Sequence, residues 1–226
     1  MRLRLLNASG KISDELIESF SELTADNYLK SRVPFRFRAF ASALVKGDTL
    51  RWTDDDSFFQ DTDINMYAGG VERRFPQLGA PAREFAERLV LAPEVRRFVG
   101  AEEFTAGCHQ IRVVATDDQV GLPAPEGFHR DGFDRVAVTC VAVENVSGAI
   151  SLVRARSGDE ERGEERGEEG DDVLLDRTMP AGETLLFDDT SVLHYVTPMT
   201  PKFPERPAYR DVVVITFAKE NGGAPA

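Results

Sequence analysis

The stretch YRDVVVITFA, residues 209–218, is the last in a series of short apolar runs that indicate the fold class. Each run is rich in β-branched residues and is bounded by turn-forming residues, which is typical of β-strands. Little helical periodicity separates one run from the next. The second half of the chain is therefore predicted to form a β-sandwich or β-barrel. The runs are residues 108–116, 134–144, 148–156, 173–178, 183–188, 191–197 and 209–218.

The first part of the chain mixes helical and strand-like patterns. Ser13 can cap a helix whose apolar residues, as far as Leu23, fall on one face. The alternating segment FRFR, residues 35–38, predicts a half-buried strand. A second helix is predicted over about 81–99, with a break near Pro93. We therefore expect helices that flank a mainly β fold.

The length of 226 residues is that of one domain, and no internal repeat divides it. We predict a single domain over residues 1–226, with a helix-rich N-terminal part, 1–103, and a β core, 104–218. An acidic run at 157–172 interrupts two of the predicted strands. A segment so rich in Gly, Glu and Arg cannot bury itself, so we expect a mobile surface insertion there.

The charge balance disfavours several classes of partner. Lys and Arg number 27 against 39 Asp and Glu, giving a formal net charge of -12. Such a chain is expected to bind neither a nucleic-acid backbone nor an anionic membrane surface. No apolar run approaches the roughly 18 residues that span a bilayer, and the N-terminus lacks a signal-peptide pattern, so we expect a cytoplasmic protein. No feature of the sequence indicates an oligomeric state.

The two cysteines give no sign of a disulfide framework or a zinc knuckle. Cys108 and Cys140 stand singly in apolar, strand-like surroundings, without a C-x-x-C spacing. We expect both to be buried thiols.

Two histidines and one aspartate could form a metal site. His129 and Asp131 are two residues apart, so on an extended segment their side chains project to the same side. His194 lies in a later predicted strand of the same β-rich half. Two histidines and a carboxylate are the ligand set that holds non-haem Fe(II) and leaves positions open. The alternative is that Asp131 and Gly132 form an ordinary turn, with His129 a polar neighbour.

Arg210 adds a cation to this picture. In the run that follows it, Arg210, Val212, Val214 and Thr216 share one face of a strand. A guanidinium at the mouth of an otherwise apolar lining is suited to pair with a carboxylate, such as that of a dicarboxylic cosubstrate. The alternative is an edge arginine that is solvated or paired with one of the many acids.

Three segments of the chain resemble one known family. They are PEGFHRDGFDRVAV (125–138), LLFDDTSVLHYVTPMTP (185–201) and RPAYRDVVVITF (206–217). They look like the bacterial 2-oxoglutarate-Fe dioxygenase family that includes the isoleucine hydroxylase-like free-amino-acid dioxygenases. The resemblance covers roughly residues 104–218 and, more loosely, the N-terminal part. The acidic insertion departs from the compact hairpin that the family leads one to expect.

The resemblance implies a double-stranded β-helix, which is a jelly-roll of two packed sheets, with Fe(II) between them. It implies that His129, Asp131 and His194 bind the iron and that Arg210 binds 2-oxoglutarate. The implied activity is hydroxylation of a free L-amino acid with O2, releasing succinate and CO2, in secondary metabolism. Ascorbate is expected to support turnover.

The segment HQIR, residues 109–112, also resembles the family's pattern. Gln110 and Arg112 lie on one face of the predicted strand, and His109 and Ile111 lie on the other, so only one set can face a central cavity. We expect the polar set to do so, which makes Arg112 and Gln110 candidates for substrate binding. His109 is then expected to be a core histidine or one that supports the site from outside.

Two alternatives to this function remain open from the sequence. The same chemistry could act on an amino acid held on a carrier protein or on a peptide. The chain could also be a non-catalytic metal-binding jelly-roll protein. Asp134, Asp188 and Asp189 could either orient a ligand imidazole or cap turns. The sequence does not define which amino acid is oxidised.

Overall fold

The structure of the protein, a computed structural model, describes residues 1–29, 31, 33–62, 69–156 and 172–219. All of the strand pairs among these residues are antiparallel. The strands are β1 (Leu3–Asn7), β2 (Thr24–Ala25), β3 (Arg36–Lys46), β4 (Thr49–Trp52), β5 (Ser57–Phe58), β6 (Arg73–Arg74), β7 (Glu103–Ala115), β8 (Arg135–Glu144), β9 (Val146–Gly148), β10 (Ser151–Ala155), β11 (Val173–Arg177), β12 (Glu183–Asp188), β13 (Val192–Val196), β14 (Met199–Pro201) and β15 (Ala208–Lys219).

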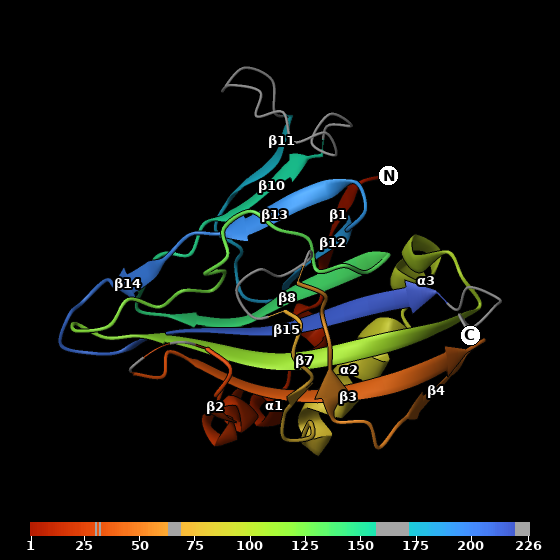
Figure 1. The fold of residues 1–226 in the computed structure, drawn as a ribbon, viewed down its shortest axis with the longest axis horizontal. Helices are drawn as coiled ribbons and strands as arrows, with labels where there is room; N and C mark the ends of the chain where they lie inside the picture. Colours follow the sequence, from red (N-terminus) through yellow and green to blue (C-terminus); the bar gives the residue numbers. More distant parts are fainter. Residues whose placement is uncertain (30, 32, 63–68, 157–171, 220–226) are drawn as a thin grey trace.

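Two sheets face each other, which is the predicted jelly-roll arrangement (Figure 1). The large sheet has the order β1-β12-β8-β15-β7-β3-β2, with β4 paired to β3. The small sheet has the order β11-β10-β13. An apolar cluster joins them, with Cys140 and Phe187 from the large sheet and Val153 and Val192 from the small one. Strands that follow one another in the chain often lie in different sheets: β12 is in the large sheet, whereas β11 and β13 are in the small one.

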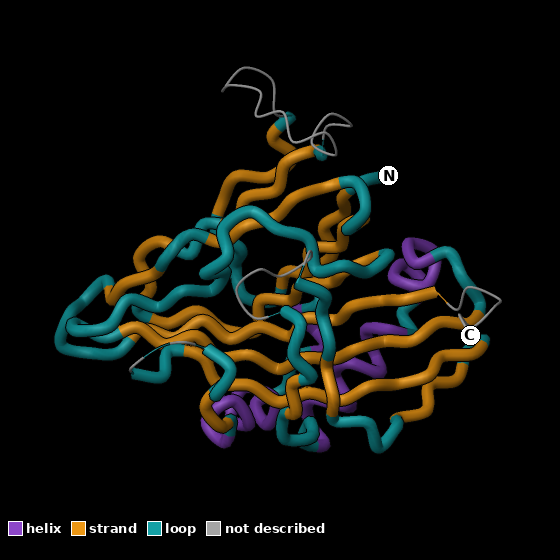
Figure 2. The backbone as a smooth tube through the Cα atoms, in the orientation of Figure 1, coloured by secondary structure: helices purple, strands orange, loops and turns teal. Residues whose placement is uncertain are grey.

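The helices cover the other face of the large sheet (Figures 1 and 2). They are α1 (Asp14–Ser19), α2 (Ala80–Val90) and α3 (Pro93–Val99), with short 3-10 turns at Ser9–Lys11 and Phe20–Glu22. Phe85 and Leu89 of α2 are fully buried against the sheet. Burial of each such side chain contributes about 1.5–3 kcal/mol. None of the described helices is long and apolar enough to cross a membrane.

Both predicted helices of the N-terminal part are present, but the first is shorter than predicted, since α1 ends at Ser19 and a 3-10 turn follows. The Ser13 hydroxyl accepts a hydrogen bond from the Leu16 N–H at the start of α1. The second helix is broken as predicted, since α2 ends at Val90 and α3 begins at Pro93. A proline is tolerated at the first helical position because that N–H has no helical partner.

The N-terminal part is less helical than expected. The predicted strand at 35–38 extends to Lys46, and β3 lies inside the large sheet beside β7. At the other edge, β1 pairs with β12. Residues 1–103 therefore supply strands to the same sheet as residues 104–218. Ala39 and Ala41 of β3 belong to the same buried cluster as Phe85 and Leu89 of α2.

All seven predicted strand runs are strands, and both cysteines are free and buried. Apart from Asp172, the acidic run at 157–172 lies outside the described residues. Strand β15 lies in the middle of the large sheet, between β8 and β7. Its side chains alternate, so that Val213, Ile215 and Phe217 pack toward the helices. The opposite face of β15 is directed at the space between the sheets.

Candidate active site

His129 and His194 lie opposite each other on adjacent extended segments. The N–H of each residue donates to the carbonyl oxygen of the other, at 3.0 Å. His194 is on β13, and the segment of His129 lies along the free side of that strand. Directly opposed residues project to the same side of a sheet, which brings the two imidazole centroids to 4.2 Å. The fold thus unites two histidines that are 65 residues apart.

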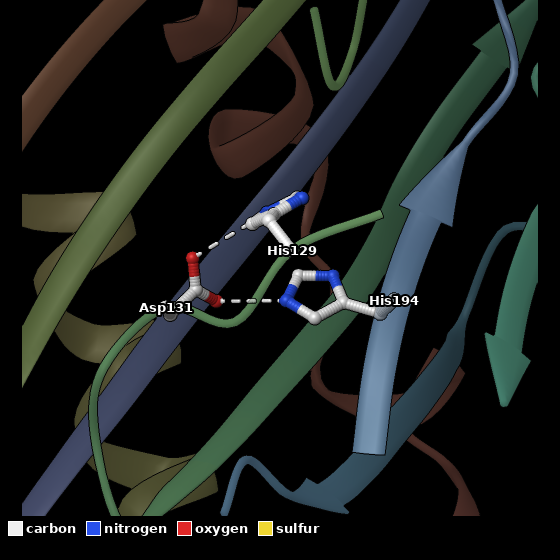
Figure 3. Close-up of side chains that lie close together, drawn as sticks. All are labelled: His129, Asp131 and His194. Carbon is white, nitrogen blue, oxygen red and sulfur yellow. Dashed lines mark ion pairs between the residues drawn. The ribbon is translucent and has the colours of Figure 1, made fainter. Parts of the chain in front are cut away.

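Asp131 completes the group, two residues after His129 and on the same side (Figure 3). Its Oδ2 lies 3.4 Å from His194 Nε2, and its Oδ1 lies 3.8 Å from His129 Nε2. The three residues can offer ligand atoms that all lie within 4.8 Å of one another. Ligands bound at about 2.1 Å and at right angles are about 3 Å apart, so a small inward movement would suit one metal ion.

The hydrogen bonds of the two histidines fit a metal site. His129 Nδ1 donates to the carbonyl oxygen of Gly127 at 2.9 Å, so its Nε2 carries the lone pair that faces Asp131. His194 Nε2 is buried and, among the described residues, makes no well-aligned hydrogen bond, although Asp131 Oδ2 lies 3.4 Å away. A buried polar atom that is poorly satisfied is costly, and a metal ion would relieve that cost. Imidazole and carboxylate ligands with open positions suit Fe(II).

Asp189 fixes the turn that carries Asp131. Its carboxylate accepts hydrogen bonds from the backbone N–H groups of Asp131, Gly132 and Phe133, at 2.7–3.0 Å. Gly132 has a φ of 87°, which only glycine adopts easily. The side chain of Asp189 is fully buried, so these bonds replace its hydration. Asp189 thus supports the segment that carries Asp131. Asp188, in contrast, accepts a hydrogen bond from the Thr190 N–H in a turn.

The acidic and imidazole side chains of this site alter one another's pKa values. Burial alone would raise the pKa of Asp131, but the neighbouring His194 and His129 lower it to about 2. Burial disfavours the protonated form of His194, yet the Asp131 carboxylate outweighs burial and raises the pKa of that imidazole. Burial and the nearby Asp131 raise the pKa of Asp189. Asp131 is therefore held as the carboxylate that a metal ion requires.

A cavity between the sheets contains all three residues. Its lining includes four arginines but only two acids, so it is electropositive in a chain whose overall charge is negative. Such a cavity favours anionic small molecules. The lining residues are Arg36, Arg38, Phe58, Gln60, Arg73, His109, Ile111, Val113, Pro123, Ala124, Glu126, His129, Asp131, Val138, His194, Val196, Arg210, Val212, Val214 and Thr216.

Arg210 lies where the strand pattern predicted, on the cavity face of β15 with Val212, Val214 and Thr216. It is 5% exposed, and one of its terminal nitrogens, Nη2, has no hydrogen-bond partner. Among the described residues, no carboxylate forms an ion pair with it. Burial lowers the pKa of Arg210, because no nearby carboxylate in the described part of the chain offsets the cost of burying its charge. A buried guanidinium without a counter-charge is a site for an anion.

The prediction that Gln110 and Arg112 face the cavity is wrong. Both lie on the helix side of β7, where Gln110 donates to the Ser19 hydroxyl and Arg112 pairs with Asp211 through two hydrogen bonds of 2.7 Å. His109, Ile111 and Val113 line the cavity instead. The prediction assumed that the helix face would be apolar, but near α1 that face offers polar partners to both residues. Gln110 therefore attaches α1 to the sheet, whereas Arg112 joins β7 to the neighbouring strand β15.

The sequence reasoning missed the arginines of β3 and β6. Arg36 and Arg38 alternate in the segment FRFR, so they share a face, and that face lines the cavity. The Arg38 Nη2 donates to His109 Nδ1 at 2.7 Å, and the His109 ring stacks on Phe40. Arg73 reaches the same wall from β6. The alternation in FRFR was the signal that could have identified the first two.

Comparisons with known proteins agree with this architecture. A protein-family model described as 2OG-Fe dioxygenase matches residues 17–216. The chain is 25% identical over 220 residues to 3(1)-hydroxy-L-isoleucine 4-dioxygenase from Pantoea ananatis, covering 91% of this chain and 81% of that protein.

Solved structures show the same fold. A bsmA homologue from Methylobium petroleophilum has a TM-score of 0.74 and 27% identity, covering 94% of this chain and 83% of that one. IDO from Bacillus thuringiensis has a TM-score of 0.68 and 15% identity, covering 97% of this chain and 90% of that one. The jelly-roll thus matches known structures over nearly its whole length.

Proposed function

As the chain belongs to the 2OG-Fe dioxygenase family, we propose that it hydroxylates a free L-amino acid. In this reaction a C–H bond of the substrate becomes C–OH, while 2-oxoglutarate and O2 yield succinate and CO2. His129, Asp131 and His194 would hold Fe(II), and Arg210 would hold 2-oxoglutarate. Bound Fe(II) would supply the activation of O2, since this ligand set leaves open positions for cosubstrate and oxygen.

The observation that carries this proposal is that the ligand group and a buried, unpaired arginine share one cavity. The Arg210 guanidinium can pair with the carboxylate of 2-oxoglutarate that lies away from the metal. The apolar residues Val212 and Val214 beside it exclude water from that pairing. His129 and His194 project from opposed backbone segments, so their positions are set before any ligand binds.

The similarity to a Pantoea ananatis protein named for a hydroxylated isoleucine supports an amino acid as the substrate. The electropositive cavity supports a substrate with a carboxylate as well as a cosubstrate with two. A free amino acid is therefore favoured over a carrier-bound one, whose carboxylate is esterified.

Product detection tests the reaction. We would incubate the protein with Fe(II), 2-oxoglutarate and ascorbate and the proteinogenic amino acids, together with pipecolate, ornithine and citrulline. Mass spectrometry would detect succinate and products that gain one oxygen. A product that requires both iron and 2-oxoglutarate supports the proposal. Succinate without any oxidised amino acid points to a carrier-bound or peptide substrate. No succinate under any condition overturns the oxygenase assignment.

The metal ligands are tested by His129→Ala and Asp131→Ala. Each is expected to abolish turnover and to lower Fe(II) binding in a metal titration, because two ligands hold the ion poorly. Asp118→Asn, on an exposed loop, is the control and should leave both unchanged. Circular dichroism checks that the variants fold. Full activity of either alanine variant contradicts the assignment.

Arg210→Met tests the cosubstrate position. We expect the dissociation constant for 2-oxoglutarate to rise at least about 30-fold, because a buried charge pair is lost. The free energy of unfolding without ligand should stay constant or rise by about 1–4 kcal/mol, since the arginine is buried without a counter-charge. Isothermal titration and chemical denaturation measure the two effects. A large loss of stability with unchanged 2-oxoglutarate binding would mean that Arg210 is structural.

A further inference from the structure

A second group of buried cations lies on the same cavity wall as Arg210 but is separate from it. Arg36, Arg38 and Arg73 line the cavity and are 8%, 6% and 1% exposed. Arg36 and Arg38 come from β3, and Arg73 comes from β6. We define these three residues as the arginine cluster. The cluster is unusual because charged side chains are rarely buried without partners.

Among the residues that the structure describes, one member of the arginine cluster has an acidic partner. Arg36 pairs with the buried Asp26 at 2.9 Å. Arg38 donates to the imidazole of His109, and Arg73 donates to the Gln60 side-chain oxygen at 2.7 Å. Within the described part of the chain, neither Arg38 nor Arg73 forms an ion pair, and the Nε of each is buried without a hydrogen-bond partner. The described hydrogen-bond partners of these two guanidiniums are neutral groups.

The surroundings of Arg38 stabilise its positive charge without supplying a negative one. The rings of Phe58 and Phe75 lie 5.1 and 4.5 Å from its guanidinium carbon, which supports the charge without neutralising it. Burial and the neighbouring Arg36 lower the pKa of Arg38 to about 9. It still carries its charge at neutral pH. Binding of a carboxylate would offset this electrostatic cost.

The strand register separates this group from Arg210. Arg36 and Arg210 are both opposite Val113 of β7, so they form one row across three strands. Strands in a sheet are about 4.8 Å apart, which places the Cα atoms of the two arginines about 10 Å from each other. Arg38 is two residues further along β3. The wall therefore carries two cationic positions, which suits two different anions.

We propose that Arg38 and Arg73 bind the α-carboxylate of the amino-acid substrate and that Glu126 receives its ammonium group. This proposal rests on the proposed function. Asp131 and Glu126 are the acids among the described residues that line the cavity, and Asp131 belongs to the metal group. Glu126 Oε1 lies 3.4 Å from His129 Nε2, so an ammonium bound there is next to the metal position. A substrate held in this way must have a free carboxylate.

Gln60 connects the carboxylate position to the metal ligands. Its oxygen accepts from Arg73, and its Nε2 donates to the carbonyl oxygen of Asp131 at 2.9 Å. One side chain thus contacts both the arginine cluster and the backbone of a ligand. This contact fixes the distance between the substrate carboxylate and the metal, which determines the carbon that is presented for oxidation.

Binding measurements test the proposal separately from turnover. The probe is the panel amino acid that gives most product, beginning with L-isoleucine. Its amide lacks the carboxylate, and its 2-hydroxy acid lacks the ammonium. Dissociation constants are measured by titration without oxygen, on protein loaded with Mn(II) and 2-oxoglutarate. The variants are Arg38→Met, Arg38→Lys, Arg73→Gln and Glu126→Gln. Arg74→Gln is the control, since Arg74 adjoins Arg73 but its side chain is 65% exposed.

We expect Arg38→Met and Arg73→Gln to weaken amino-acid binding at least about 30-fold, with 2-oxoglutarate binding within about 3-fold of the wild type. Arg38→Lys should recover part of the loss. The wild type should bind the amide at least about 30-fold more weakly than the acid. Glu126→Gln should weaken binding of the amino acid but not of the 2-hydroxy acid. Arg74→Gln should change nothing.

Three results overturn the proposal. Amino-acid binding that is unchanged in folded Arg38→Met and Arg73→Gln would leave the proposed function standing and remove this binding role. A loss of 2-oxoglutarate binding in those variants would assign the arginine cluster to the cosubstrate. If the wild type neither binds nor oxidises any amino acid of the panel, the proposed function fails together with the inference.

Discussion

A single buried carboxylate determines the shape of the segment that carries Asp131. Asp189 accepts three backbone N–H groups from consecutive residues of that segment, and its Oδ1 lies 4.0 Å from His194 Nε2. It therefore holds Asp131, one proposed metal ligand, by its backbone and lies beside His194, another proposed ligand. Such supporting groups fix the geometry of a metal site although they do not bind the metal.

Asp189→Asn is expected to lower Fe(II) affinity by about 10–100-fold, because the amide cannot accept all three hydrogen bonds. The free energy of unfolding should fall by about 1–3 kcal/mol for the same reason. Metal titration and urea denaturation measure these effects. Asp188→Asn is the matched control, since Asp188 pairs with Arg135 and does not contact the ligand segment. Equal effects of the two substitutions would contradict the role of Asp189.

His109 is a buried histidine that stays neutral. Burial first, and then the charges of Arg38, Arg73 and Arg36, hold its pKa well below the usual 6.5. The unfolded chain takes up a proton on this residue below pH 6.5, but the folded chain does not. The folded state therefore has its full stability above pH 6.5 and loses stability as the pH falls below that value.

The pH dependence of stability checks this account. The unfolding free energy of the wild type should fall by up to about 1.4 kcal/mol more per pH unit, below pH 6.5, than that of His109→Gln. Glutamine can still accept from Arg38, which makes the variant a suitable comparison. Urea denaturation at pH 7.5, 6.5 and 5.5 measures the slopes. Parallel curves for the two proteins would mean that His109 protonates normally in the folded state.

At the scale of elements, the small ladder of β9 and β14 fixes the chain on both sides of the site. β14 begins three residues after the end of β13, the strand that carries His194. β9 pairs with β14. The Ala149 N–H donates to the Pro198 carbonyl at 3.3 Å. Gly148, at the end of β9, has a φ of 85°, and a Cβ there would collide with the Pro198 carbonyl oxygen. Glycine is therefore required at this position.

Gly148→Ala should lower the free energy of unfolding more than Gly47→Ala does. Gly47 also has a positive φ, but a Cβ added there would meet nothing within 4 Å, so Gly47→Ala reports the backbone cost alone, about 1–2 kcal/mol. The collision at Gly148 should add about 1–3 kcal/mol. Denaturant unfolding of both variants measures the difference. Equal losses would show that β9 and β14 can separate without cost.

At the scale of the whole molecule, the large sheet is covered on both faces, by helices on one and by the small sheet on the other. Cys108 packs in the cluster under the helices, and Cys140 packs in the cluster between the sheets. Burial raises the pKa of Cys108 to about 12 and also raises that of Cys140. Both thiols are therefore protected as long as the two layers remain in place.

Thiol labelling reports whether both layers stay closed. The native protein is expected to react with a disulfide reagent such as Ellman's at neither cysteine on the time scale of minutes, and at both after denaturation. The absorbance of the released thiolate measures the number of cysteines that have reacted. Rapid reaction of one cysteine in the native protein would show that the layer covering it opens.

The sequence alone predicts the strand runs and the common side of His129 and Asp131. The β-branched runs are strands wherever the side-chain period of two is satisfied, and a H-x-D pair on an extended segment has both side chains on one side. The sequence also predicts that Arg210 shares a face with Val212, Val214 and Thr216, because side chains two residues apart in a strand point to the same side. These features depend only on residues that are near one another in the chain.

Which face of each strand meets the cavity follows from the tertiary structure and not from the sequence pattern. The period of two assigns Gln110 and Arg112 to one face of β7 and His109 to the other, but it is blind to what covers either face. The contacts of Arg38 with His109 and of Gln60 with Asp131 each join residues 71 apart in sequence. The first contact arises because β3 lies beside β7 in the sheet, and the second joins two segments outside the strands, so no local pattern encodes either. The arginine cluster is visible for that reason only in the folded protein.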